Sequence, residues 1–262
     1  MKKTFLIMAF FSIFLLAGCN QQSDSTAENT RAEQQDQSRL IKQNRKVWNE
    51  KVRSAKDIRL PNYDRYITKV PTGYNDDGML LARLEKGNQL VVKAKVMNLQ
   101  PEFGLFTVET KASILITKVI SGDESLQGKT VKTEFSGGLA KAKDYFTDIE
   151  GNYSGKEFGV NDPKTIIYST NPVIPMPKIG NTVILGLSRY RAENKYQQKM
   201  AQKNGLMTKD SYMINNPEVT YWIMGHGEFK LNNPAFYRKE SQGKYPNLFK
   251  LTKVLNEKYA NK

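Results

Sequence analysis

Apolar and polar side chains alternate along several stretches of the chain beyond about residue 60. A period of two is typical of strands that bury one face, so each stretch predicts a half-buried strand. The clearest stretches lie at residues 92–96, 106–117, 129–135, 181–189, 218–224 and 228–231. Gly122 and Gly128 enclose a short turn-forming segment between the second and third of these strands. Such a tight return predicts antiparallel pairing.

Helical spacing flanks this β region on both sides. Near the C-terminus, apolar residues recur at intervals of three to four over residues 247–259, which predicts a closing helix. Residues 39–59 carry apolar side chains that fit one helical face: Leu40, Ile41, Val47, Trp48 and Val52. The pattern predicts a mainly β (α+β) fold, with a small antiparallel barrel or sandwich over residues 60–262, an amphipathic helix before it and a helix at its end.

The first residues follow the three-part plan of a secretory signal peptide. Lys2 and Lys3 give a positive start, and residues 5–17 are apolar apart from Ser12. A helix of this length rises about 20 Å, which is short of the ~30 Å hydrocarbon core of a bilayer. The pattern therefore favours a cleaved leader over residues 1–18 rather than a permanent membrane span.

Leu16-Ala17-Gly18-Cys19 resembles the lipobox of Gram-positive (Firmicutes) lipoproteins. The resemblance implies that a dedicated signal peptidase recognises Leu16, Ala17 and Gly18, and that Cys19 receives a diacylglyceryl group. Two acyl chains hold a protein firmly to a membrane. The expected location is the outer face of the cytoplasmic membrane, lipid-anchored and extracytoplasmic. The alternative is a chance cleavage site that leaves an unpaired thiol.

A polar segment follows the cysteine. Residues 20–38 contain only two apolar side chains, Ala27 and Ala32. A segment with so little apolar surface does not order itself by burial. Residues 19–38 are therefore expected to form the lipidated cysteine and a flexible tether.

Residues 39–59 are strongly basic, with eight Lys and Arg against Glu50 and Asp57, a net charge of +6. Two interpretations stay open. The helix contacts an anionic surface through Lys42, Arg45 and Lys46, or it packs on the domain with its cations in solvent. The second is favoured, because most amphipathic helices of folded chains pack on their own domain.

The whole chain is basic as well. Its 262 residues include 40 Lys and Arg against 26 Asp and Glu, a formal net charge of +14. Without Lys2 and Lys3 of the leader, the balance is 38 against 26, or +12. An exported basic protein meets anionic lipids and teichoic acids first. These are the expected partners, together with an unidentified protein, and nucleic acid is disfavoured.

Cys19 is the only cysteine and His226 the only histidine. A single cysteine excludes an internal disulfide and a cysteine-rich metal centre. A single histidine, between two glycines, removes most histidine-based catalysis. We therefore expect no metal and no cofactor.

The β region also resembles a known module. In order, its motifs are Gly122-Asp123, Gly128-Lys129-Thr130-Val131, Gly137-Gly138, Lys178-Ile179-Gly180-Asn181 before an aliphatic strand, and a late strand with Gly225, Gly227 and Phe229. They resemble an OB-like β-barrel module common in uncharacterised Firmicutes surface proteins. The chain differs from that module by insertions at about residues 139–177 and 191–217. The resemblance implies an OB-like barrel and carries no catalytic residue.

Three classes of function follow. The favoured one is a lipid-anchored, non-enzymatic binding or interaction protein, whose insertions offer aromatic side chains for stacking: Tyr145, Phe146, Tyr153, Phe158, Tyr168, Tyr190 and Tyr196. The second is a cell-wall-active hydrolase that uses acidic residues of the 139–177 insertion, since two carboxylates suffice for glycoside hydrolysis: Asp144, Asp148, Glu150 and Glu157. The third is an OB-like binder of polyanions or nucleic acid.

Overall fold

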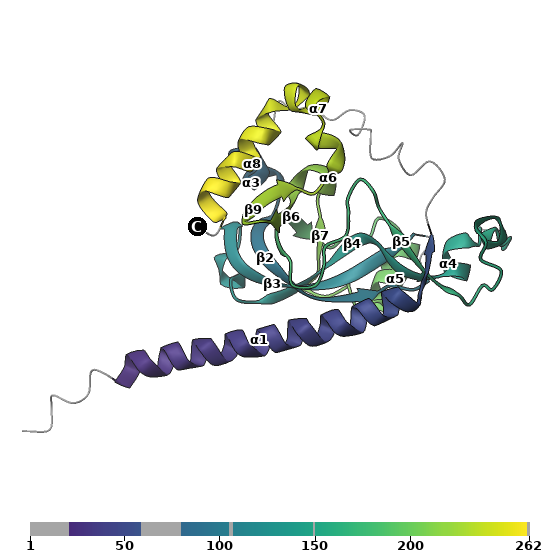
Figure 1. The fold of residues 1–262 in the computed structure, drawn as a ribbon, viewed down its shortest axis with the longest axis horizontal. Helices are drawn as coiled ribbons and strands as arrows, with labels where there is room; N and C mark the ends of the chain where they lie inside the picture. The colour runs from purple at the N-terminus through teal and green to yellow at the C-terminus, as the bar shows by residue number, and fades with distance from the viewer. Residues whose placement is uncertain (1–20, 59–79, 105–106, 149, 261–262) are drawn as a thin grey trace, which may run out of the picture.

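The computed structural model describes residues 21–58, 80–104, 107–148 and 150–260 (Figure 1). The α-helices are α1 (Gln21–Ser54), α3 (Leu81–Gly87), α4 (Ala142–Phe146), α5 (Lys195–Lys203), α6 (Pro217–Thr220), α7 (Lys239–Lys244) and α8 (Pro246–Tyr259). The strands are β1 (Lys56–Ile58), β2 (Leu90–Pro101), β3 (Glu109–Ser121), β4 (Thr130–Lys141), β5 (Ile166–Thr170), β6 (Thr182–Arg189), β7 (Tyr212–Ile214), β8 (Tyr221–Gly225) and β9 (Glu228–Leu231). Short 3-10 helices are η2 (Glu124–Leu126), η3 (Gly155–Phe158) and η4 (Pro234–Tyr237).

The strands form one nine-stranded sheet in the order β1-β5-β4-β3-β2-β6-β8-β9, and β7 pairs with β6 beside this path. These pairs are antiparallel except for β1 with β5. The sheet curls into a half-barrel surrounded by several helices (Figure 1). The prediction of a mainly β domain with helices at both ends is confirmed.

Each stretch with alternating side chains lies in or overlaps a strand, and β2, β3 and β4 extend beyond their predicted ends. The turn between β3 and β4 contains Gly122 and Gly128, whose φ angles of 106° and 80° lie in the region that glycine tolerates best. Residues 218–224 differ at their start, because Pro217–Thr220 forms α6 before β8 begins. Proline at the first helical position favours that short helix.

Apolar side chains fill both faces of the sheet. On one face, alternating residues of β2, β3, β4 and β6 join Trp48 of α1 in the largest apolar cluster, which we call the main core. On the other face, Trp222 of β8 packs with Leu251 of α8, and Ile167 of β5 packs with Phe146 of α4. In Figure 1, α1 and α8 accordingly lie on opposite sides of the sheet.

Helix α1 differs from its prediction at both ends. It begins at Gln21, inside the segment expected to be a flexible tether, and it ends at Ser54, before Lys56–Ile58 forms the edge strand β1. Gln, Glu, Ala and Arg make up most of residues 21–38, and these residues favour helix even where no apolar contact supports it. In Figure 1, the N-terminal part of α1 projects beyond the sheet.

The docked face of α1 is narrower than the spacing predicts. Ile41 and Val52 pack on the main core beside Trp48, which is only 6% exposed. Leu40 and Val47, expected on the same face, are 48% and 46% exposed. Each precedes a docked residue by one position, which is about 100° around the helix axis. That rotation places both side chains at the edge of the contact.

The two expected insertions lie partly within the sheet. Residues 139–177 contain β5, which pairs with β4. Residues 191–217 contain α5 and also β7, which pairs with β6. Strands of five and three residues are too short to show a clear alternation, and the sequence pattern therefore missed both.

Candidate functional site

Lys42, Arg45 and Lys46 lie in the half of α1 that docks on the sheet. Lys42 and Lys46 are exposed. Arg45 instead turns toward the domain, where its Nε donates a hydrogen bond of 2.9 Å to the carbonyl oxygen of Ile179. Gly180, with a φ of 92°, permits this approach, because a Cβ there would collide with the Arg45 guanidinium. Arg45 therefore holds the helix on the domain, while the two lysines face solvent.

Lys42 and Lys46 belong to a larger group that we call the cationic stripe: Arg39, Lys42, Lys46 and Arg53. These side chains are exposed and fall within about 60° of one another around the helix axis, on the side opposite to Trp48. Arg39 also pairs with Asp36 at 3.1 Å. Glu50 is the only acidic residue between positions 39 and 53. The stripe is therefore a line of positive charge that points away from the sheet.

The leader over residues 1–18 and the lipobox residues Leu16, Ala17, Gly18 and Cys19 lie outside the described residues. Helix α1 begins at Gln21, two positions after Cys19. Within the ranges that the structure covers, no helix has the length and apolar character needed to cross a membrane.

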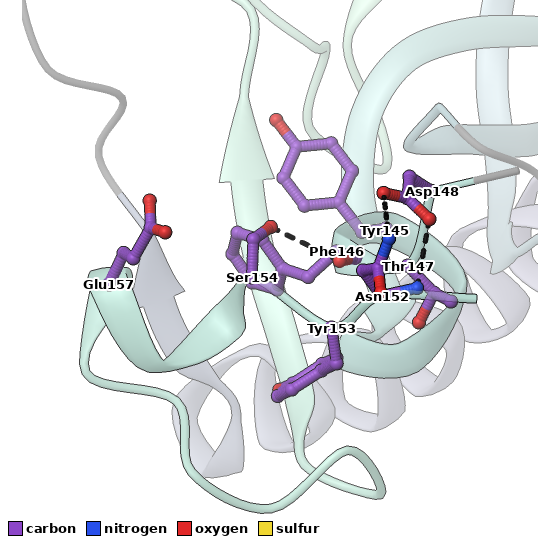
Figure 2. Close-up of a pocket in the computed structure, with 8 residues that line it drawn as sticks. All are labelled: Tyr145, Phe146, Thr147, Asp148, Asn152, Tyr153, Ser154 and Glu157. Carbon is purple, nitrogen blue, oxygen red and sulfur yellow. Dashed lines mark hydrogen bonds between the residues drawn. The ribbon is translucent and has the colours of Figure 1, made fainter. Parts of the chain in front are cut away.

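An open pocket of about 520 Å³ lies in the 139–177 segment, around α4 and η3 (Figure 2). Its lining residues are Tyr145, Phe146, Thr147, Asp148, Asn152, Tyr153, Ser154 and Glu157. Phe146 is buried and stacks on Phe158, with 5.0 Å between ring centroids. In Figure 2, Asp148 turns toward Asn152, and Glu157 lies apart from the other labelled side chains. The pocket thus combines aromatic walls with carboxylates at its edge.

Two of the acidic residues predicted for this segment support local structure. Asp148 accepts hydrogen bonds from the backbone N–H groups of Asn152 and Glu150. These bonds, first that of Asn152, hold the pKa of Asp148 below its ordinary value. Asp144 accepts a hydrogen bond of 2.9 Å from the backbone N–H of Gly104. Glu150 and Glu157 are exposed. A glycosidase acid needs a raised pKa, and Asp148 is shifted the other way.

The predicted aromatic residues do not form one surface. Four of them pack in or against the apolar cluster around Phe146: Tyr145, Phe146, Tyr153 and Phe158. Tyr168 packs against the main core. The hydroxyl group of Tyr196 donates a hydrogen bond of 2.6 Å to the carbonyl oxygen of Gly104, and Tyr190 lies beside the carboxyl groups described next. Packing rather than ligand stacking therefore accounts for most of these rings.

Three glutamates that the sequence did not single out form a group that we call the carboxyl cluster: Glu102, Glu109 and Glu134. The sheet register places Lys111 of β3 opposite Glu134 of β4. The backbone N–H of Glu102 donates a bond of 3.2 Å to the carbonyl of Glu109. Because side chains alternate along a strand, Glu109 and Lys111 point away from the main core, which contains Ala112.

Burial is the largest cause of a raised pKa in each of these glutamates. It raises the pKa of Glu109 to about 8, with a further contribution from the negative charge of Glu134. The Glu102 and Glu134 side chains interact with each other, and burial raises the pKa of both. Tyr190 lies near the three glutamates, and burial, followed by their negative charges, raises its own pKa to about 12. The cluster therefore keeps protons at a pH where exposed carboxyl groups have lost them.

Residues 190–211, which we call the cover segment, lie over the carboxyl cluster. The Nζ atom of Lys111 donates a bond of 2.6 Å to the carbonyl oxygen of Asn204. Lys132 of β4 pairs with Asp210 at 3.7 Å. Met200 and Leu206 of the segment are buried. The cover segment is thus fastened to the polar side of β3 and β4 by polar bonds and a few apolar contacts.

The sequence contains a weak signal for this cluster. Glu109 and Lys111 occupy polar positions of one predicted strand, and Glu134 occupies a polar position of the next. Polar positions on a strand normally indicate a solvated face. Only the register, which places Lys111 opposite Glu134, together with the distant cover segment, brings these partly buried residues together beside the buried Glu102.

No protein-family model matches the chain, and no curated protein matches it either. In the described part of the chain, no group of three or more His, Cys, Asp or Glu side chains is arranged to hold a metal ion. The function is therefore inferred from α1 and the pocket.

Proposed function

We propose that the protein is a lipid-anchored extracytoplasmic binding protein that rests on the membrane through the cationic stripe of α1. In this proposal, a signal peptidase reads Leu16, Ala17 and Gly18, and Cys19 carries the diacylglyceryl anchor. The observation that carries the proposal is the orientation of the stripe, which is exposed on the side of α1 opposite to its docked face. The surface it contacts is formed by anionic phospholipid headgroups.

The position of α1 in the chain favours headgroups as the anionic surface. The helix starts two residues after Cys19 and has 34 residues, so it is about 50 Å long. A helix attached to an anchor at Cys19 stays near the bilayer if its long axis lies along the membrane surface. The domain then lies on the side of the helix that faces away from the membrane. Each Lys or Arg close to an anionic membrane contributes about 1 kcal/mol. Three of the four stripe cations, Lys42, Lys46 and Arg53, are free of the pair that Arg39 makes with Asp36, and together they favour that orientation over the opposing charge of Glu50.

The domain above the stripe is the binding module of this proposal. We interpret its curled sheet as an OB-like barrel, because its glycine motifs follow one another in the order typical of that module. Barrels of that type bind ligands through strands and loops on one face. The pocket of Figure 2 lies in such a loop segment, and Asp148 there is bonded within a turn. The structural role of Asp148 in that turn favours ligand binding over hydrolysis at the pocket.

Charge reversal on the stripe tests the contact with lipid. The chain from residue 20, prepared without lipid, should bind vesicles of anionic phospholipid, and Lys42→Glu with Lys46→Glu should weaken that binding by at least about 30-fold, from about 1 kcal/mol per lysine removed. Arg45 stays unchanged, because it bonds to Ile179. Cosedimentation at two salt concentrations measures the effect, which should shrink at high salt because exposed charges are screened beyond about 8 Å at physiological ionic strength.

A matched control reverses two exposed lysines elsewhere, Lys230 of β9 and Lys250 of α8. This variant has the same net charge as the first and should keep most of the binding. Equal losses in both variants would mean that total charge, rather than the stripe, drives binding. Binding to teichoic acid but not to vesicles would contradict headgroups as the surface.

A further inference from the structure

The carboxyl cluster contains three ionisable groups that have no role in the proposed function. Full ionisation of Glu102, Glu109 and Glu134 would place three negative charges beside the single ammonium group of Lys111. Glu102 is only 2% exposed, and its Oε1 atom has no hydrogen-bond partner. A buried carboxylate oxygen without a donor strongly disfavours the ionised form. The closed arrangement therefore suits protonated carboxyl groups.

The surroundings of the cluster agree with this. The Glu102 and Glu134 carboxyl groups interact with each other, and burial, followed by the negative charge of Glu134, raises the pKa of Glu102. Two carboxyl groups that face each other share a hydrogen bond only if one of them carries a proton. Tyr190, the first residue of the cover segment, lies near all three glutamates, and burial and their negative charges raise its pKa. Protonated carboxyl groups therefore suit the contact between the sheet and its cover.

We propose that the carboxyl cluster is a proton-operated latch, which holds the cover segment on β3 and β4 in acid and releases it as the pH rises. The proposal does not depend on the membrane contact. When the cover segment lifts, the three glutamates meet water and return toward their ordinary pKa of 4.5. Opening therefore releases protons, and high pH favours it.

The direction follows from linkage between protonation and opening. The closed state has the raised pKa values, so its advantage is complete below pH 4.5 and is lost as the pH rises through those values, about 8 for Glu109 and about 9 for Glu102. In that window, each carboxyl group that keeps its proton only in the closed state multiplies the opening constant by up to about 10 per pH unit. Tyr190 stays neutral throughout, because its pKa is about 12.

Other charged groups near the cluster are paired or lie at its margin. Lys111 donates a hydrogen bond to the carbonyl oxygen of Asn204. Lys132 pairs with Asp210, and Asp144 is bonded to the N–H of Gly104. Two more lysines lie close by: Lys141, over the ring of Phe103, and Lys203, next to Gly104. Of these cations, Lys111 is the one that lies directly opposite Glu134 in the sheet register.

Hydrogen exchange of the full mature chain tests the latch. Peptides covering residues 190–211 are compared with a β6 peptide, at pH 5.5 and pH 7.5, with EDTA present and rates corrected for intrinsic exchange. If one carboxyl group acts alone, the opening constant of the cover segment should rise by about 100-fold between pH 5.5 and pH 7.5. The increase should be confined to that segment. The variant Glu102→Gln, Glu109→Gln, Glu134→Gln should stay closed at both pH values, because it cannot ionise.

Glu109→Gln alone serves as a second variant if the triple change prevents folding. It should reduce the pH dependence of the opening constant by up to about 10-fold per pH unit. Glu228→Gln, an exposed change on β9, is the control and should behave as wild type. An equal pH dependence in wild type and the Gln variants would overturn the latch. So would closure at pH 7.5 by added calcium or magnesium that requires the glutamates, since the cluster would then be a cation site.

Discussion

Replacing Cys19 with alanine is expected to remove the mature protein from the membrane fraction. Each buried methylene of an acyl chain contributes about 0.8 kcal/mol to membrane binding, so two chains anchor the protein nearly permanently. The proposed contact through the cationic stripe is expected to be weak and salt-sensitive by comparison. Without the lipid, the chain should be released to the medium or remain as the unprocessed precursor. Immunoblots of membrane and medium fractions measure the distribution.

Asn20→Ala is the matched control for this change, because it alters the neighbouring residue and leaves the lipobox intact. It should remain in the membrane fraction at the mature size. If Cys19→Ala stayed there at the mature size as well, the anchor would have to lie elsewhere in the chain.

Replacing Trp48 with alanine is expected to lower the free energy of unfolding by about 3–5 kcal/mol, the range for removing a large aromatic side chain from a core. Trp48 is 6% exposed and joins α1 to the main core. Its loss leaves the helix held by Ile41, Val52 and the bond from Arg45 to Ile179. Urea unfolding measures the change, and protease cleavage within α1 shows whether the helix has detached.

The neighbouring residue provides the control for this measurement. Val47 is 46% exposed, so Val47→Ala should change stability by less than about 0.5 kcal/mol. A similar loss in both variants would show that the helix docks on a different face. A negligible effect of Trp48→Ala would show that the indole does not contribute to the core.

The sequence pattern predicts most of the sheet, because β2, β3 and β6 are long enough to show alternation. It does not predict β5 or β7, which are held in place by strands that pair beside them. The error at Leu40 and Val47 has a similar origin. Spacing along the chain identifies a helix, but only the partner surface decides which 100° sector is buried.

The carboxyl cluster shows a further limit of the sequence. Glu109 and Glu134 occupy positions that a solvated strand face would also contain, and Glu102 follows the end of β2. What distinguishes them is burial beneath residues 190–211, a segment that follows Glu134 by more than fifty positions. Local patterns carry no information on such a cover. For the cationic stripe, the local charge pattern identified Lys42 and Lys46, but it also included Arg45, which bonds to Ile179 instead.

The proposed role of Cys19 as the lipidated first residue of the mature protein is tested most directly by the intact mass of that protein. Protein extracted from the membrane fraction of cells that produce it is analysed by mass spectrometry. We expect the mass of residues 19–262 increased by a diacylglyceryl group on Cys19. A membrane-bound chain that retains residues 1–18, or that carries a free thiol at Cys19, would contradict it.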